Sequence, residues 1–274
     1  MTNVSFQGER GAYSESAIYS FFGSSVQVVP LRNISDVFEA VEKRKTEYGV
    51  IPIENSIEGS VNQSYDMFLR YDLKVCGEIV LRIRHCLITN PTTDLGSIEM
   101  IYSHPQALAQ CRNYLEKLGC EFMSTYDTAG SVKMMKEKRL FNAAAIAGER
   151  AAEIYGMKII AKGIEDNPNN YTRFFVLSEH DSPSTKNDKT SIIFATKHVP
   201  GALYHVLEEF AARNINLRKI ESRPTKQQPW EYNFYLDFEG HRSEKRCKDA
   251  LNSLEGKSSF LKVLGSYPKA KEAF

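Results

Sequence analysis

Apolar residues in the first part of the chain alternate between strand-like runs and helix-like stripes. Apolar and β-branched runs predict strands at residues 4–6, 26–30 and 48–53. Between them, apolar positions at helical spacing predict one helix from about residue 13 to 22 and a second helix capped by Ser35. A strand–helix–strand–helix–strand order is typical of an open α/β sheet, which places its ligands at the carboxyl ends of the strands.

A second alternation of the same kind follows. It predicts strands at 100–103, 122–125, 143–147 and 158–161, and helices that begin at Pro105 and Asp127 and run from Glu149 to Tyr155. The segment 73–89 between the two sets is strand-like throughout. In it Arg82 and Arg84 should share a solvated face, and His85 should be a hydrogen-bonded core residue. Two such sets, joined near 73–90 and 160–173, predict a two-lobed body with a cleft.

The pattern changes after the polar segment 180–189, which reads as a linker. Apolar runs and helical stripes then predict the order β-α-β-β-α-β, which is a ferredoxin-like module. We therefore expect an α/β protein with three parts. These are a domain at 1–180 (first lobe about 1–75 and 165–180, second lobe about 76–164), a linker at 181–188, and the ferredoxin-like module at 189–268.

Composition narrows the class of protein. The formal net charge of +1 gives no electrostatic case for nucleic-acid binding, and no apolar run approaches the roughly 20 residues of a membrane span. The N-terminus lacks the basic and apolar regions of a signal peptide. The chain has 5 cysteines, an odd number without a CxxC pair, which indicates reduced thiols in a cytoplasm. Its 6 histidines are scattered, and we expect neither a metal nor a cofactor.

Candidate chemistry gathers where loops meet predicted strands. Asn169 to Arg173 place amides, a hydroxyl and a guanidinium directly before the apolar strand 174–177. This stretch is either a ligand site or a plain strand entry with Asn turns and a surface arginine. Consecutive polar residues at 54–56 follow the third strand and favour a ligand site. The glycine turn at 8–14 presents backbone N–H groups to an anion, or is only a tight turn, since it has neither GxGxxG nor GK[ST].

A series of motifs occurs in one order along the chain. They are Gly8-x-x-Gly11-x-Tyr13-Ser14, Pro52-Ile53-Glu54-Asn55-Ser56-x-x-Gly59, Ser103-His104-Pro105-Gln106 with Gln110, Asp127-Thr128-Ala129, Thr172-Arg173-Phe174, Gly201-Ala202-Leu203 and Glu221-Ser222-Arg223-Pro224. With these motifs the chain resembles, essentially from end to end, the prephenate dehydratases that carry a C-terminal ACT domain. The chorismate mutase segment of bifunctional relatives is not found, so we expect a monofunctional enzyme.

The resemblance implies a catalytic domain similar to type II periplasmic binding proteins and the decarboxylative dehydration of prephenate to phenylpyruvate in L-phenylalanine biosynthesis. It implies Thr172 as the catalytic hydrogen-bond donor. The residues expected to bind substrate are Asn55, Ser56, Ser103, Gln110, Arg173 and Glu54. Strand alternation places Thr172 and Arg173 on opposite faces if both lie in the strand, so Arg173 could instead brace the loop.

The resemblance also implies feedback inhibition by L-phenylalanine bound at the ACT domain. The residues expected to bind this effector are Gly201, Ala202, Leu203, Asn214, Asn216, Leu217, Glu221 and Ser222. ACT domains pair, so a homodimer or homotetramer is expected. Two alternatives stay open: an arogenate dehydratase, with the same chemistry on an amino-acid side chain, and a non-catalytic amino-acid sensor.

Overall fold

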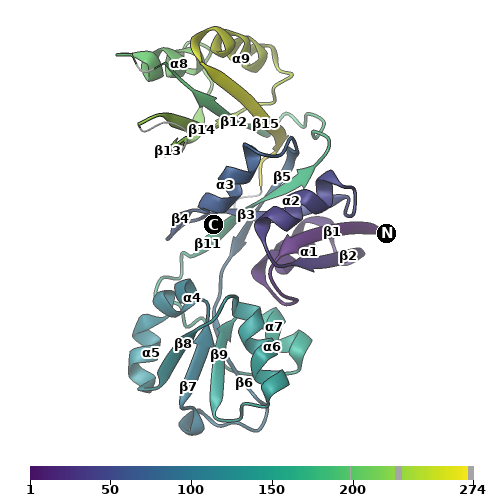
Figure 1. The fold of residues 1–274 in the computed structure, drawn as a ribbon, viewed down its shortest axis with the longest axis vertical. Coiled ribbons are helices and arrows are strands. Elements are labelled where there is room, and N and C mark those ends of the chain that lie inside the picture. Colours follow the sequence, from purple (N-terminus) through teal and green to yellow (C-terminus); the bar gives the residue numbers. More distant parts are fainter. Residues whose placement is uncertain (198, 226–229, 271–274) are drawn as a thin grey trace. The chain divides into compact units, whose positions relative to one another are not determined.

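A computed structural model describes residues 1–197, 199–225 and 230–270 (Figure 1). Among the described residues the chain divides into two compact units, the first comprising residues 1–70 and 79–174 and the second comprising 71–78 and 175–270. The first unit holds most of two sheets, and the second holds a third sheet together with the start of β5 (residues 74–78) and the end of β11 (residues 175–178). No helix in the described ranges is long and apolar enough to cross a membrane.

The first sheet has the strand order β2-β1-β3-β11-β5, with the short strand β4 paired to β3. Its strands are β1 (Thr2–Gln7), β2 (Val26–Leu31), β3 (Tyr48–Asn55), β4 (Gly59–Ser60), β5 (Lys74–Arg82) and β11 (Tyr171–Ser178), and its helices are α1 (Tyr13–Phe22), α2 (Ile34–Glu42) and α3 (Asn62–Phe68). β1 pairs in parallel with both β2 and β3, which agrees with the expected open α/β sheet. Phe38 and Phe68 meet edge to face, with ring centroids 5.2 Å apart, and join α2 to α3.

The expected N-cap of α2 was wrong by two residues. Helix α2 begins after Asn33, and the Asn33 backbone N–H donates to Asp36 Oδ2 at 3.1 Å. Asp36 lies three residues beyond the cap, so it completes a capping box that Ser35 cannot form.

The second sheet has the strand order β10-β6-β9-β7-β8. Its strands are β6 (Cys86–Thr89), β7 (Met100–Ser103), β8 (Glu121–Ser124), β9 (Ala143–Ala147) and β10 (Lys158–Lys162), and its helices are η1 (Leu95–Ser97), α4 (Pro105–Gln110), α5 (Arg112–Leu118), α6 (Thr128–Lys138) and α7 (Glu149–Tyr155). All five residues of β9 are buried, and their small side chains let α6 pack closely against the strand. The predicted bounds of β9 and α7 are confirmed.

The strand-like segment 73–89 does not form one strand. It is divided between β5 in the first sheet and β6 in the second. The backbone between them is bonded to other parts of the chain: the Ile83 N–H donates to Asn170 O, and the His85 N–H donates to Glu165 Oε2 at 2.8 Å. The chain therefore changes sheets at residues 83–85, because these tertiary bonds replace the strand ladder there.

The single helix expected to begin at Pro105 is also interrupted. It breaks at Cys111 into α4 and α5. Asp166 causes this break, since its N–H donates to Gln110 O at 2.7 Å and its carboxylate accepts the Asn113 N–H at 3.1 Å. These bonds take a carbonyl and an amide that a continuous helix would use.

The second unit contains a four-stranded antiparallel sheet with the order β13-β14-β12-β15. Its elements are β12 (Asp188–Ala195), α8 (Ala202–Ala211), β13 (Leu217–Pro224), β14 (Tyr232–Glu239), α9 (Lys245–Lys257) and β15 (Phe260–Pro268). The predicted β-α-β-β-α-β order is confirmed. Its core includes Phe194, Val206, Phe210, Phe238 and Leu254, all fully buried.

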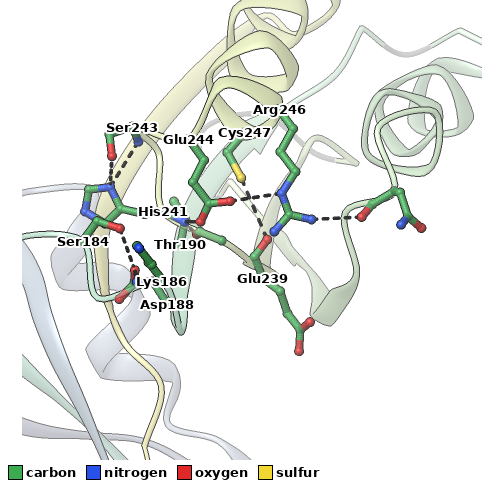
Figure 2. Close-up of polar contacts among 12 residues, drawn as sticks. Ser184, Lys186, Asp188, Thr190, Glu239, His241, Ser243, Glu244, Arg246 and Cys247 are labelled. Carbon is green, nitrogen blue, oxygen red and sulfur yellow. Dashed lines mark hydrogen bonds and ion pairs between the residues drawn. The ribbon is translucent and has the colours of Figure 1, made fainter.

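The polar segment before β12 is held by one carboxylate. Asp188 Oδ2 accepts hydrogen bonds from Ser184 Oγ at 3.0 Å and from the Lys186 N–H at 3.1 Å (Figure 2). Lys186 has a φ of 68°, and a bond from its amide helps to offset the cost of that left-handed conformation. The polarity that marked this segment as a linker thus serves to order the turn into β12.

Candidate active site

A pocket of about 680 Å³ lies in the first unit. Its walls come from segments that follow strands of both sheets: the starts of α1 and α2, the loop after β3, the link between β5 and β6, helix α4, and the start of α6. Thr172 and Phe174 of β11 complete the lining. The pocket therefore lies where an α/β fold gathers the carboxyl ends of its strands.

Thr172 is anchored in this pocket by an amide. Asn55 Nδ2 donates to Thr172 Oγ1 at 3.0 Å and to Asn170 Oδ1 at 2.7 Å. Asn55 Oδ1 accepts the backbone N–H groups of Ile57 and Glu58 at 2.9 and 3.0 Å, which fixes the orientation of the amide. Thr172 Oγ1 therefore acts as an acceptor toward Asn55, and its own hydrogen is available to a molecule in the pocket.

His85 also lines the pocket, although it was expected to be a core residue. It is indeed buried, with 2% exposure, and both ring nitrogens have partners: Tyr13 Oη lies 2.9 Å from Nδ1 and Gln110 Oε1 lies 3.0 Å from Nε2. Burial lowers the pKa of His85 and raises that of Tyr13. At neutral pH both groups are therefore uncharged.

The structure brings three of the expected catalytic and substrate-binding residues to the pocket. These are Thr172, Asn55 and Gln110. Ser56 lies beside them as a brace, since its Oγ donates to Asn169 O at 2.9 Å and accepts the Tyr171 N–H at 2.9 Å.

The other expected residues lie outside the pocket lining. Ser103 is fully buried, and its Oγ donates to Ile146 O at 2.6 Å. Arg173 pairs with Glu54 at 3.5 Å, and its side chain is 12% exposed. Because Arg173 follows Thr172 in a strand, its side chain points to the other face, as alternation predicts.

Arg32, which the sequence analysis did not single out, lines the pocket at the end of β2. Of the described lining residues, only Arg32 carries a guanidinium or ammonium group. It is exposed, and the described residues offer it no ion-pair or hydrogen-bond partner. A lone arginine after a strand gives no sequence signal, so only the fold identifies it as the available cation.

A second pocket of about 470 Å³ lies in the second unit, lined by residues 196–204 other than the undescribed 198. Gly201 precedes α8 with a φ of 78°, a conformation that favours glycine, and Ala202 and Leu203 follow it in the lining. The remaining expected effector residues, Asn214, Asn216, Leu217, Glu221 and Ser222, lie in β13 or just before it, outside this lining. Three of the eight expected effector residues, Gly201, Ala202 and Leu203, therefore line this pocket, and the other five do not.

The described residues contain no cluster of His, Cys, Asp and Glu that could hold a metal ion. All five cysteines are free thiols, and burial raises the pKa of Cys76 to about 12. A thiol with such a pKa stays protonated at neutral pH, so Cys76 is an inert core residue.

Comparison with known proteins identifies both units. The sequence profile described as prephenate dehydratase matches residues 4–182, and the profile described as ACT domain matches 190–256. The bifunctional chorismate mutase/prephenate dehydratase of Aquifex aeolicus is 45% identical over 269 residues, which cover 97% of this chain and 74% of that protein. Arogenate dehydratase/prephenate dehydratase 2 of Arabidopsis thaliana is 44% identical over 276 residues, with coverage of 97% and 72%.

Solved structures agree with this match. The prephenate dehydratase of Arthrobacter aurescens in complex with L-Phe is 31% identical, with a TM-score of 0.90 over 98% of this chain and 90% of that chain. A chain described as GqqA, a novel type of quorum quenching acylase, is 30% identical, with a TM-score of 0.88 over 97% of both chains. The predicted fold class, an α/β domain of the prephenate dehydratase family followed by a ferredoxin-like ACT module, is confirmed.

Proposed function

Because the chain belongs to the prephenate dehydratase family and carries an ACT domain, we propose that this lyase converts prephenate to phenylpyruvate and that L-phenylalanine inhibits it. The reaction belongs to L-phenylalanine biosynthesis. Prephenate loses its ring carboxylate as CO2 and its ring hydroxyl as water, and the ring becomes aromatic. Aromatisation drives the reaction, so the enzyme has to help hydroxide leave as the C–C bond breaks.

The Asn55–Thr172 contact is the observation that carries this proposal. Because Asn55 Nδ2 donates to Thr172 Oγ1 at 3.0 Å, the threonine can present its own hydrogen to the leaving hydroxyl. A threonine hydroxyl is a weak acid, so Thr172 acts as a positioned donor or as a relay for water, not as a strong proton source. A donor of this kind lowers a barrier by about 2–4 kcal/mol.

The neutral groups around Thr172 suit a decarboxylation. Asn55 and Gln110 hold a substrate without fixed positive charge near the ring carboxylate. A strong ion pair there would stabilise the ground state more than the transition state and slow the loss of CO2. The side-chain carboxylate of prephenate takes no part in bond breaking, so a cation can bind it without this penalty.

We assign that task to Arg32. Its substitution by glutamine is expected to raise KM for prephenate by about fivefold with kcat nearly unchanged, since an exposed ion pair contributes up to about 1 kcal/mol. The effect should shrink as salt is added. Steady-state kinetics at two ionic strengths test this, with Arg70→Gln, an exposed arginine outside the pocket lining, as the control. An unchanged KM at low salt would remove Arg32 from the substrate site.

Arogenate, which carries an amino group in place of the keto group, remains the alternative substrate. Relatives named for each activity are similar to this chain. One assay separates the readings: phenylpyruvate formed from prephenate and phenylalanine formed from arogenate, each with and without added L-phenylalanine. Turnover of arogenate alone would replace the proposed substrate, and binding of an amino acid without turnover of either would indicate a sensor.

The likeness to an acylase suggests amide hydrolysis as a further control reaction. An acyl-transfer nucleophile needs a neighbouring base. Thr172 instead receives a hydrogen bond from an amide, which suits a donor and not an activated nucleophile. We therefore expect no hydrolysis of N-acyl amides by the purified protein.

For regulation, we propose that L-phenylalanine binds beside Gly201. Substitution of Gly201 by alanine is expected to relieve inhibition by at least tenfold in effector concentration and to leave uninhibited turnover intact, because Gly201 lines this pocket and a Cβ there, 3.5 Å from His205 Nε2, changes the shape of the backbone turn that the effector would contact. A positive φ also makes alanine unfavourable there by about 1 kcal/mol. Gly156→Ala is the matched control, since Gly156 has a φ of 64° and lies outside this pocket. Full sensitivity to L-phenylalanine in the Gly201 variant would contradict the assignment.

The expected effector residues outside this lining are consistent with a site completed by a second ACT domain. We therefore propose a homodimer or homotetramer formed through the ACT domains, in the cytoplasm. The domain limits that we propose remain 1–180 for the catalytic domain, 181–188 for the linker and 189–268 for the ACT domain. We propose that Ser56, Arg173 and Glu54 brace the end of β3 against the start of β11, that Ser103 braces β7 against β9, and that none of the four contacts substrate.

A further inference from the structure

A continuous series of hydrogen bonds runs through the first unit to Thr172, and we call it the polar chain. Its members, in order, are Tyr13, His85, Gln110, Asn170, Asn55 and Thr172. The middle of the polar chain is shielded from solvent, since Asn170 is fully buried and His85 is 2% exposed. Buried amides of this kind keep one orientation. If one amide flipped by 180°, an N–H donor would face another donor and an oxygen would face another acceptor.

The direction of each bond follows from the backbone. Two backbone N–H groups point at Asn55 Oδ1, so Asn55 Nδ2 must donate to its other neighbours. Asn170 then accepts from Asn55 through Oδ1 and donates through Nδ2 to Gln110 Oε1 at 2.8 Å. Gln110 Oε1 can only accept, so the His85 Nε2 that lies 3.0 Å from it must carry a hydrogen.

The histidine end of the polar chain fits the same direction. With the hydrogen of neutral His85 on Nε2, its Nδ1 is an acceptor, and the Tyr13 hydroxyl 2.9 Å away can donate to it. Tyr13 Oη also lies 2.9 Å from Arg84 O, a second acceptor for the same hydrogen. Burial, which lowers the pKa of His85, keeps the ring in this neutral form at neutral pH.

We propose that His85 and Tyr13 are positioning residues for the dehydration. The backbone N–H groups at Asn55 Oδ1 set the direction of the polar chain, and His85 and Tyr13 hold its far end: the His85 Nε2–H keeps Gln110 Oε1 in place for Asn170, so that Asn170 and Asn55 stay where Asn55 donates to Thr172 and the threonine hydrogen is free for the substrate. The proposal rests on the proposed function, because it gives Thr172 the role of donor. Neither ring nitrogen of His85 is free for the substrate, so His85 acts through Thr172.

Substitutions of His85 test whether kcat depends on the hydrogen-bond donor at Nε2. His85→Leu, which removes it, is expected to lower kcat by about ten- to a hundredfold, as misplacement of a catalytic group does. The side chain of His85→Gln places an N–H donor at the position of Nε2, so its kcat should be close to that of the wild type. The shorter side chain of His85→Asn reaches only the position of Nδ1, so its kcat should stay as low as that of His85→Leu. KM should change by less than about threefold in all of them, because the substrate contacts remain.

Tyr13 gives a second, independent readout. Tyr13→Phe removes the hydroxyl that faces Nδ1 and should lower kcat in the wild-type background. In the His85→Gln background Nδ1 is gone, so the same substitution should have little further effect. This non-additivity is expected only if the two residues act through one hydrogen-bond chain.

The measurements are kcat and KM from phenylpyruvate absorbance, with far-UV circular dichroism and thermal unfolding to compare the folding of each variant. If wild-type protein does not turn over prephenate, the proposed function fails before this question arises. If wild-type protein is active, equal kcat in the Gln, Asn and Leu variants would overturn the positioning role. Additive effects of the Tyr13 and His85 substitutions would overturn it as well.

Discussion

Replacement of Thr172 by alanine is expected to lower kcat for prephenate by about a hundred- to a thousandfold, the usual effect of removing one donor to developing negative charge. The substitution should change folding little. Thr172 is only partly buried, and Asn55 Nδ2 keeps Asn170 Oδ1 and Tyr171 O as acceptors. The loss should therefore fall on the chemical step and leave KM nearly constant.

Two further substitutions separate the hydroxyl from the shape of the side chain. Thr172→Ser keeps the hydroxyl but lacks the methyl group that restricts χ1, so partial activity is expected. Thr172→Val keeps the shape without the hydroxyl and should resemble alanine. Rapid-quench or steady-state assays on folded, purified variants decide the matter. Near-normal turnover by the alanine or valine variant would exclude Thr172 as the donor.

The regular elements were predictable because local periodicity specifies them. The buried alanine strand β9, helix α7 and the β-α-β-β-α-β order of the second unit were all predicted from spacing alone. Two of the errors fall where a distant residue intervenes. Asp166 breaks the helix at Cys111, and Glu165 binds the backbone at His85, where the chain leaves one sheet for the other. Spacing cannot show either contact, because both join residues over 50 positions apart.

The candidate active site was also predictable only in part. Motifs identified Thr172, Asn55 and Gln110, which all line the pocket. The sequence did not distinguish a histidine that is both buried and part of the pocket wall, so His85 was assigned to the core. Arg173 attracted attention as a guanidinium, yet it pairs with Glu54, while Arg32 lines the pocket. Residue type suggests what a side chain can do, but the fold decides which side chains converge.

Replacement of Gly265 by alanine is expected to destabilise the second unit by about 3 kcal/mol, at the upper end of overpacking effects. Gly265 lies in β15, where the register against β12 shifts. A Cβ built at Gly265 would lie 2.1 Å from Val75 O and 2.8 Å from Val75 N. Both neighbours are backbone atoms of β5, so no change of rotamer can relieve the clash, and the strand itself must move.

The matched control is Gly256→Ala in helix α9. A Cβ there meets no atom within 4 Å, and alanine favours helix over glycine by up to about 1 kcal/mol. Thermal unfolding should thus show a clear loss of Tm for the Gly265 variant and an unchanged or higher Tm for the Gly256 variant. Since the residues that line the catalytic pocket belong to the first unit, kcat of the folded Gly265 variant should be largely retained at low temperature. An unchanged Tm after Gly265→Ala would mean that β15 and the start of β5 do not pack as closely as these distances require.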